Sequence, residues 1–119
     1  MKIMYLICLI LFLSPFTHAL ETQTISVNKG QTKRITLESN PSTGYSWALT
    51  KTVKKHDPIV ITKSGYIPEQ TDRVGAGGMQ FWDIKARMPG KTELLFEYKR
   101  PWEKNTAPVK TKEVIIYVK

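Results

Sequence analysis

The sequence predicts an all-β domain. Proline and glycine recur along the chain and divide it into short segments rich in β-branched and aromatic residues. Several segments alternate apolar with polar side chains, which is the period of a strand with one buried face. The 119 residues allow one domain. Seven such segments, with turns at this spacing, indicate an immunoglobulin-like β-sandwich of about seven strands.

The first half of the domain is expected to supply four strands, each placed by its apolar residues. The first two alternate apolar and polar side chains, and an Asn-Lys-Gly-Gln turn at 28–31 separates them. The third repeats the alternation, and the fourth is a short β-branched run with at least one buried face. Their apolar residues are, in order, Ile25 and Val27; Ile35 and Leu37; Tyr45, Trp47 and Leu49; and Ile59, Val60 and Ile61.

The second half supplies three strands with the same alternation. Their inner-face residues are Trp82, Ile84 and Ala86; Thr92, Leu94, Phe96 and Tyr98; and Val114, Ile116 and Val118, the last within a strand at about 111–118. Trp47 and Trp82 follow the strand period and are expected in the core. A helical turn in 50–57 stays open, because Leu49 and Val53 are four residues apart. Residues 64–74 contain few core candidates and are expected to form an exposed excursion.

Residues 1–19 have the pattern of a secretory signal peptide. Lys2 gives a positive start, and residues 3–13 form an apolar run. The run is shorter than the ~20 residues that span a bilayer. We therefore expect cleavage after Ala19, with a retained N-terminal anchor as the alternative. The domain 20–119 is then expected to be a monomer without membrane attachment, located outside the cell, in a periplasm or in a secretory or lysosome-like vesicle.

Cleavage would also restrict the chemistry of the domain. Residues 20–119 contain no cysteine and one histidine, His56. A cysteine nucleophile, a disulfide framework and a Cys/His zinc site are therefore excluded within one chain. A Ser-His-Asp triad could use only His56, which precedes Asp57-Pro58 and is expected in a surface turn. We expect no enzyme activity, no metal and no cofactor.

Three connections differ from ordinary short polar turns. The first consists of Asn40, Pro41, Ser42, Thr43, Gly44 and Tyr45. Pro41 fixes its own φ and favours an extended Asn40, while Gly44 can adopt a positive φ and turn the chain back. We expect a stiff turn with the hydroxyls of Ser42 and Thr43 pointing outward. An ordinary well-formed turn would give the same signals.

The second connection is glycine-rich and contains Gly75, Ala76, Gly77 and Gly78. A phosphate cradle would need a following helix, whereas the next segment alternates like a strand. We therefore expect backbone that approaches another surface closely, with flexibility alone as the alternative.

The third connection follows the strand that ends at Tyr98 and contains Arg100, Pro101 and Trp102. Trp102 lies outside any apolar alternation, and tryptophan and arginine dominate interface hot spots. The alternative is that Trp102 folds back onto the sandwich. The three connections join strands two to three, four to five and six to seven, which lie at one end of an immunoglobulin-like sandwich. We therefore expect them to form one surface.

These segments resemble the three loops of the chagasin family, which are secreted protein inhibitors of papain-like cysteine peptidases. The first resembles the family's NPTTGY-type loop, with Ser42 where the usual motif has threonine. The second resembles its GxGG loop and the third its RPW loop. The resemblance extends over nearly all of 20–119, including the strand pattern from 74 to 103.

The resemblance implies reversible inhibition without a covalent bond. The three loops would form a wedge in the peptidase cleft, with Ser42 and Thr43 over the catalytic cysteine and histidine. The loops containing Gly77 and Trp102 would contact either side. Arg100 would make a polar contact or support its loop from within. Ser42 keeps the hydroxyl and lacks one methyl, worth under about 1 kcal/mol of burial, so it is expected to tune affinity.

The charge of the domain leaves other functions open. Without Lys2, the chain has 17 basic and 10 acidic side chains, a net charge of +7. A basic secreted module that binds anionic glycan or nucleic acid is one alternative, although interleaved acids favour a solvated surface and no nucleic-acid partner is expected. The charge could instead steer association with an acidic peptidase. An adhesion domain would explain the fold but not the three loops. The densest lysine clusters are Lys51, Lys54 and Lys55, and Lys110 with Lys112.

Overall fold

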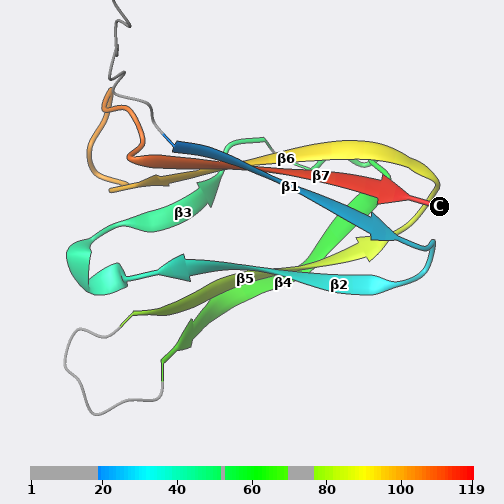
Figure 1. The fold of residues 1–119 in the computed structure, drawn as a ribbon, viewed down its shortest axis with the longest axis horizontal. Coiled ribbons are helices and arrows are strands. Elements are labelled where there is room, and N and C mark those ends of the chain that lie inside the picture. Colours follow the sequence, from blue (N-terminus) through cyan, green and yellow to red (C-terminus); the bar gives the residue numbers. More distant parts are fainter. Residues whose placement is uncertain (1–18, 52, 70–76) are drawn as a thin grey trace, which may run out of the picture.

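The computed structural model describes residues 19–51, 53–69 and 77–119. Their strands form two facing sheets (Figure 1). In chain order the strands are β1 (Ala19–Val27), β2 (Thr32–Ser39), β3 (Ser46–Leu49), β4 (Ile59–Pro68), β5 (Gly78–Ala86), β6 (Gly90–Lys99) and β7 (Lys110–Val118). The prediction of an immunoglobulin-like all-β sandwich with about seven strands is confirmed.

One sheet has the strand order β1-β7-β6-β3 and the other β2-β5-β4. Neighbouring strands are antiparallel except β1 and β7, which run parallel with Ile25 opposite Ile116. The sequence did not predict this parallel pair, because alternation identifies the buried face of a strand but not its neighbour. The pairing attaches the first described residues to the last strand of the domain.

The core lies between the sheets and consists largely of the residues that alternation placed on inner faces. Phe96 and Ile116 are fully buried. Trp82 packs on Phe96 with ring centroids 4.5 Å apart, so its predicted place in the core is confirmed. Trp47 is only partly buried against the core. Its indole Nε1 donates a hydrogen bond to Glu38 O over 2.8 Å, which links β3 to β2 in the opposite sheet.

Strand β4 is longer than the sequence predicted. The apolar run indicated a short strand and 64–74 was expected to be an excursion, yet β4 continues to Pro68. A β-bulge after Ile61 inserts one residue opposite β5, so the inward-facing positions change from odd to even numbers. The side chains of 62–68 are exposed, as expected, but the backbone prediction is wrong there. Residues 70–74 lie outside the described residues.

The connection 50–58 between β3 and β4 contains bends and a turn, and its described residues form no helix. The helical turn that the spacing of Leu49 and Val53 left open is therefore not formed. His56 is exposed in this turn, as predicted. Over 19–51, 53–69 and 77–119, the structure contains no helix of the length and apolarity needed to cross a bilayer.

Candidate functional site

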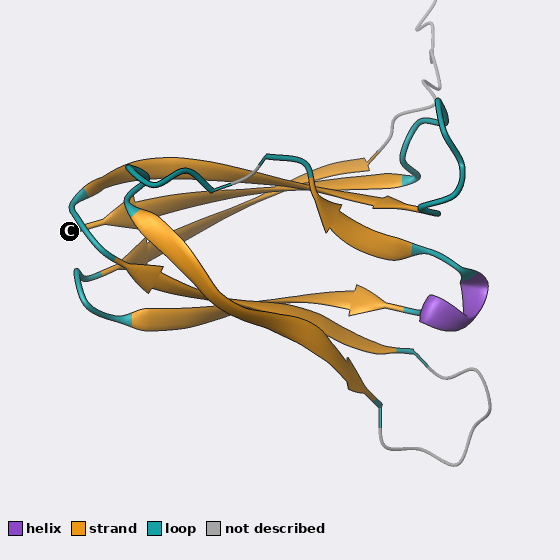
Figure 2. Ribbon diagram, turned by 180° about the vertical axis from the view of Figure 1, so that it is seen from behind, coloured by secondary structure: helices purple, strands orange, loops and turns teal. Residues whose placement is uncertain are grey.

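The three connections singled out by the sequence leave the sheets at one end of the sandwich. Figure 1 and Figure 2 show the β2–β3 and β6–β7 connections at the same end as the last residues of β4 and the first of β5, opposite the C-terminus. Arg100 Nε donates a hydrogen bond to Thr43 O over 3.3 Å, which joins the third connection to the first. The predicted convergence is confirmed for the described residues, while Gly75 and Ala76 lie outside them. We call this surface the loop end.

The first connection contains a short 3-10 helix, Pro41–Thr43, organised by Asn40. Oδ1 of Asn40 accepts hydrogen bonds from Ser42 N at 3.2 Å and Ser42 Oγ at 2.5 Å. The carbonyl oxygen of Asn40 accepts one from Thr43 Oγ1 at 2.7 Å. Gly44 has a φ of 84°, and its N–H donates to Pro41 O at 2.9 Å, so the chain turns back as predicted.

The stiff turn is thus confirmed, and Ser42 and Thr43 are exposed at its tip, but both hydroxyls donate hydrogen bonds within the loop. Short polar side chains in turns find backbone and side-chain acceptors close in sequence. Here both acceptors belong to Asn40: its side-chain Oδ1 accepts from Ser42, and its backbone oxygen accepts from Thr43. The hydrogen bonds fix the side chains of Ser42 and Thr43 before any partner arrives, so little rotamer freedom remains to be lost on binding.

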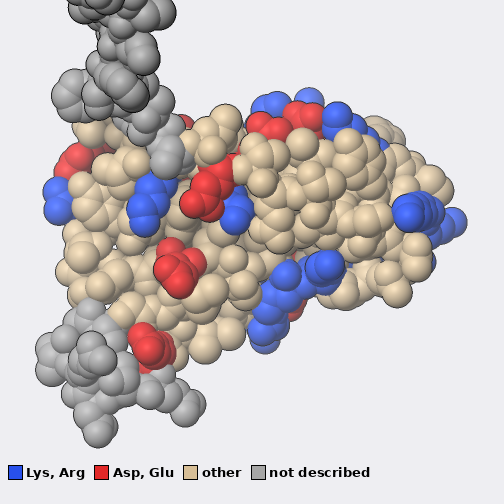
Figure 3. All heavy atoms as spheres, viewed as in Figure 1, with Lys and Arg blue, Asp and Glu red and all other residues tan. Residues whose placement is uncertain are grey.

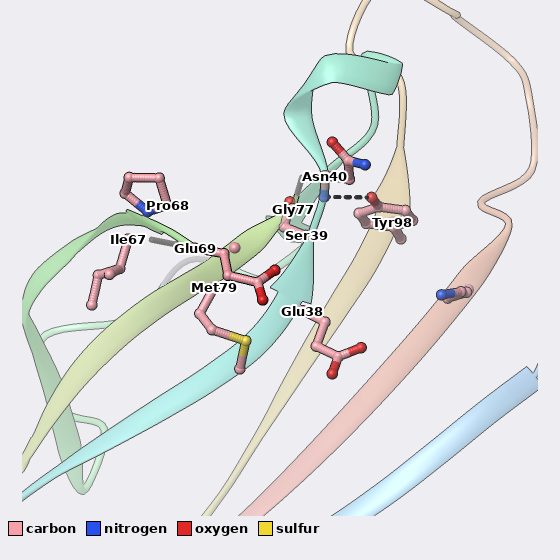
Figure 4. A pocket seen from close by; sticks show the side chains of 11 residues that line it. Glu38, Ser39, Asn40, Ile67, Pro68, Glu69, Gly77, Met79 and Tyr98 are labelled. Atoms are coloured by element: carbon pink, nitrogen blue, oxygen red, sulfur yellow. Dashed lines mark hydrogen bonds between the residues drawn. The ribbon is translucent and has the colours of Figure 1, made fainter. Parts of the chain in front are cut away.

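A stack of aromatic rings supports this turn. Tyr98, the last inward-facing residue of β6, accepts a hydrogen bond from Asn40 N at its hydroxyl oxygen over 3.1 Å (Figure 4). Its ring packs against those of Tyr45 and Trp47, with centroids 5.5 and 5.0 Å apart. Sequence reasoning treated Tyr98 as a strand residue and missed this role. The available signal was its position two residues before Arg100.

Arg100 supports the loop end from within. Its guanidinium carbon lies 4.4 Å from the centre of the Tyr45 ring. Nη1 donates to Glu103 Oε1 over 3.0 Å, in addition to the Nε contact with Thr43 O. Of the two roles that the sequence left open for Arg100, the intramolecular one is present in the structure.

Trp102 is exposed and braced at the same time. Its side chain is 66% exposed, far more than that of Trp47 or Trp82. The ring packs against Gly44, where a β-carbon would overlap with the indole. Trp102 therefore shows features of both alternatives. It folds back onto the first connection, and most of its surface is still exposed to a partner.

Gly77 and Gly78 lie where β2, β4 and β5 come close together. A β-carbon at Gly77 would lie 3.0 Å from Ser39 O, and one at Gly78 would lie 2.6 Å from the Tyr66 hydroxyl oxygen and overlap with Ile67 O. The sequence predicted that the backbone at these glycines approaches another surface closely. In the structure that surface is formed by β2 and β4 of the same chain.

A cavity of about 630 Å³ opens beside these glycines, at the base of the loop end (Figure 4). Ser39 Oγ is buried in this region and has no hydrogen-bond partner among the described residues. Glu38, Glu69 and Lys110 supply the charged side chains of the lining. Within the part of the chain that the structure describes, no three His, Cys, Asp or Glu residues form a group suited to a metal ion.

The sequence matches a known family over most of its length. Residues 26–116 match the family model of the chagasin family peptidase inhibitor I42. The chain belongs to the chagasin family. Since this is a family of peptidase inhibitors, the protein is an inhibitor and not an enzyme, as the sequence led us to expect.

This member of the chagasin family is similar in sequence to amoebiasin-1 and in fold to two inhibitors of known structure. Amoebiasin-1 of Entamoeba histolytica is 30% identical over 82 residues, which cover 69% of this chain and 78% of amoebiasin-1. The cysteine protease inhibitor EhICP2 from the same organism has a crystal structure with a TM-score of 0.67 and 22% identity, covering 84% of this chain and 96% of EhICP2. PbICP-C, solved in complex with falcipain-2, has a TM-score of 0.60 and 24% identity, covering 88% and 93%. Both structures share the fold of this chain.

Proposed function

We propose that the protein is a reversible, non-covalent inhibitor of papain-like cysteine peptidases. It would block the active-site cleft with a wedge of three loops, 40–45, 75–78 and 100–102. The observation that carries the proposal is the convergence of the described residues of these segments, with Arg100 bonded to Thr43 and Trp102 resting on Gly44. EhICP2, which has the same fold, is itself a cysteine protease inhibitor.

The geometry of the first loop explains how a peptide segment could occupy a peptidase cleft without being cut. A peptidase cleaves an extended substrate strand. Here Pro41–Thr43 form a tight 3-10 turn closed by the hydrogen bond from Gly44 N to Pro41 O. The turn and its support by Tyr98 oppose the extended conformation that the catalytic cysteine would attack, so the loop fills the cleft by shape.

Each loop has a distinct part in the proposed wedge. Ser42 and Thr43 would lie over the catalytic cysteine and histidine, and Gly77 and Gly78 would contact one side of the cleft. Trp102 would be the aromatic anchor on the other side, since a large exposed indole on a braced loop loses little entropy on binding. Three loops could supply the roughly 800 Å² per partner of a standard interface.

Titration of the chain 20–119 against papain and a cathepsin tests the proposal. Replacing Trp102→Ala should weaken inhibition by about 2 kcal/mol or more, roughly 30-fold, because the main anchor is lost. The melting temperature should stay close to that of the unchanged protein, since Trp102 contributes little to the core. Tyr117→Ala is a matched control, because Tyr117 is an exposed aromatic on β7 near the opposite end. Absence of inhibition at micromolar concentration across several such peptidases would refute the proposal.

We further propose that the inhibitor is exported, with residues 1–19 removed as a signal peptide. The support is the positive start, the apolar run at 3–13 and the small residue Ala19. Cleavage after Ala19 would leave Leu20 to Val27 in place to pair with β7. Intact-mass measurement of the protein recovered outside the cytoplasm should give the mass of 20–119, and recovery of the uncleaved chain would contradict the proposal.

A further inference from the structure

The charge of this protein is concentrated at the end opposite the three loops. We define the basic pole as residues 28–33, 50–51, 53–58, 85–93 and 117–119. These segments contain nine lysine or arginine side chains and two carboxylates, whereas the rest of 20–119 contains eight of each sign. The whole net charge of +7 therefore belongs to the pole. Its basic residues are Lys29, Lys33, Lys51, Lys54, Lys55, Lys85, Arg87, Lys91 and Lys119.

Backbone hydrogen bonds bring these distant segments together. Lys29 N donates to Lys119 O over 2.9 Å, and Arg87 N donates to Pro58 O over 2.7 Å. A third bond, from Gly30 N to Ala86 O at 2.9 Å, joins the first turn to the end of β5. On the face drawn in Figure 3, the charged side chains seen at the end near the C-terminus are lysine or arginine, while most acidic side chains lie toward the loops.

Arg87 fixes the connection that carries the densest lysines. Its Nη2 donates to the carbonyl oxygens of Lys54, Lys55 and Asp57, at 3.3, 2.7 and 2.8 Å. The carboxylate of Asp57 accepts a hydrogen bond from the backbone N of Lys54 at 2.5 Å. The backbone is thus held from inside, and the side chains of Lys51, Lys54 and Lys55 are exposed.

The pole is hollowed and carries uncompensated charge. Cavities of about 650 and 420 Å³ share Lys51, Val53 and Lys54, and the lining of the smaller one includes Lys55 and Arg87 but no carboxylate. In the described part of the chain, Lys91 is the one lysine of the pole with a side-chain carboxylate within 4 Å, that of Glu93 at 3.3 Å. Like charges gathered in this way repel one another, and a bound polyanion would relieve the repulsion.

Steering toward an acidic peptidase does not explain this arrangement. A positive end attracts an acidic partner to itself, and this end faces away from the three loops (Figure 1). The charge would therefore favour unproductive orientations in an encounter with the cleft. A second partner that binds the basic pole would account for the position of the positive charge at this end.

We propose that the basic pole binds a linear sulfated polysaccharide while the loop end stays free for a peptidase. Eight of its nine basic residues are lysines, whose compact ammonium groups suit single sulfate groups. Binders of single-stranded nucleic acid use stacked aromatic rings, and Tyr117 is the one exposed large aromatic within the described pole. The described pole consists of turns and strand ends, with no helix to enter a duplex groove. The inference goes beyond the proposed inhibition and does not depend on it.

Binding of the chain 20–119 to immobilised heparin, across a range of salt concentrations, tests the proposal. The unchanged protein should be retained at about 0.15 M salt, with affinity that falls as salt rises. The triple variant Lys51→Gln, Lys54→Gln, Lys55→Gln should bind heparin at least about tenfold more weakly. The slope of the logarithm of its affinity against the logarithm of the salt concentration should fall in magnitude by about three, one for each lysine. The melting temperature of this variant should be unchanged, because Lys54 and Lys55 hydrogen-bond to Arg87 and Asp57 through backbone atoms that the substitutions keep.

The matched control is Lys63→Gln, Lys99→Gln, Lys104→Gln, which removes the same charge outside the pole and should bind heparin nearly as the unchanged protein does. Equal losses in the two triple variants would overturn the proposal, because net charge alone would then explain retention. Failure of the unchanged protein to bind immobilised heparin at about 0.15 M salt would also overturn the proposal. Tighter binding to duplex DNA or to phosphatidylserine vesicles than to heparin would assign the pole to another class of polyanion.

Discussion

At the scale of single residues, Asn40 and Tyr98 determine the conformation of the first loop. Asn40 accepts hydrogen bonds from the backbone and side chain of Ser42 and from the side chain of Thr43. Tyr98 holds the backbone N–H of Asn40 from inside the sandwich. The proline and glycine of this loop were sufficient to predict a stiff turn. The hydrogen bonds of the two hydroxyls were not predictable, because they depend on where the atoms of Asn40 lie in space.

Replacing Tyr98→Phe tests whether this support matters for inhibition. The ring contacts with Tyr45 and Trp47 would remain, but the part-buried N–H of Asn40 would lose its acceptor. We expect a loss of about 1 kcal/mol in the free energy of unfolding, measured by denaturant titration. We also expect the inhibition constant to rise several-fold, because the turn would sample other conformations. Lower stability with unchanged inhibition would mean that Tyr98 serves the fold alone.

Gly44→Ala should affect the loop end more than the fold. A side chain at φ 84° costs about 1 kcal/mol, and the new methyl would displace the indole of Trp102. We expect at least about tenfold weaker inhibition of papain, since the anchor would leave its braced position. Gly30→Ala is the control, because Gly30 has a φ of 90° with open space around it. Both variants should lose similar stability, and a similar loss of inhibition in both would contradict the role of the Trp102 contact.

At the scale of strands, alternation predicted those elements whose period is unbroken. It located β1, β2, β5, β6 and β7 through residues such as Ile25, Ile35 and Val114. It failed in β4, because the bulge after Ile61 reverses which residues face inward, and the exposed residues beyond it do not alternate between apolar and polar. A bulge depends on the partner strand, so its position is not visible in one segment of sequence.

A cross-strand ion pair between β2 and β5 predicts the response of the fold to acid. Arg34 Nε and Nη2 donate to the two carboxylate oxygens of Asp83 at 2.7 and 3.0 Å, and the guanidinium also covers the Phe81 ring. The hydrogen bonds from Arg34 lower the pKa of Asp83 below its usual value. The stabilisation is therefore fully present above the ordinary aspartate pKa of about 3.9 and is lost as pH falls through the lower pKa of the folded state.

Thermal unfolding between neutral pH and about pH 2.5 checks this prediction, with Asp83→Asn as the comparison. The variant should be less stable than the unchanged protein at neutral pH, and the difference should shrink at the acid end of the range. A difference that stays constant with pH would show that the ion pair does not contribute through its charge.

At the scale of the whole molecule, the sandwich separates two surfaces with different properties. The loop end could be predicted from sequence, because the order of the strands alone brings the three connections together. The same order places the turns of the basic pole at the other end, but in the sequence their lysines are scattered along the chain and interleaved with acids, which favours a solvated surface. Hydrogen bonds between the turns at 28–31, 53–58 and 86–90 join these lysine-bearing segments directly.

This separation predicts that the two ends act independently. A strand of nine residues such as β7 spans roughly 30 Å at ~3.3 Å per residue, whereas charges are screened over about 8 Å at physiological ionic strength. The triple variant Lys51→Gln, Lys54→Gln, Lys55→Gln should therefore inhibit papain with a constant within about twofold of the unchanged protein. Its association rate should vary with salt as that of the unchanged protein does. A rate more than about fivefold slower at low salt would mean that the pole steers the peptidase after all, and that the charge and the loops serve one encounter.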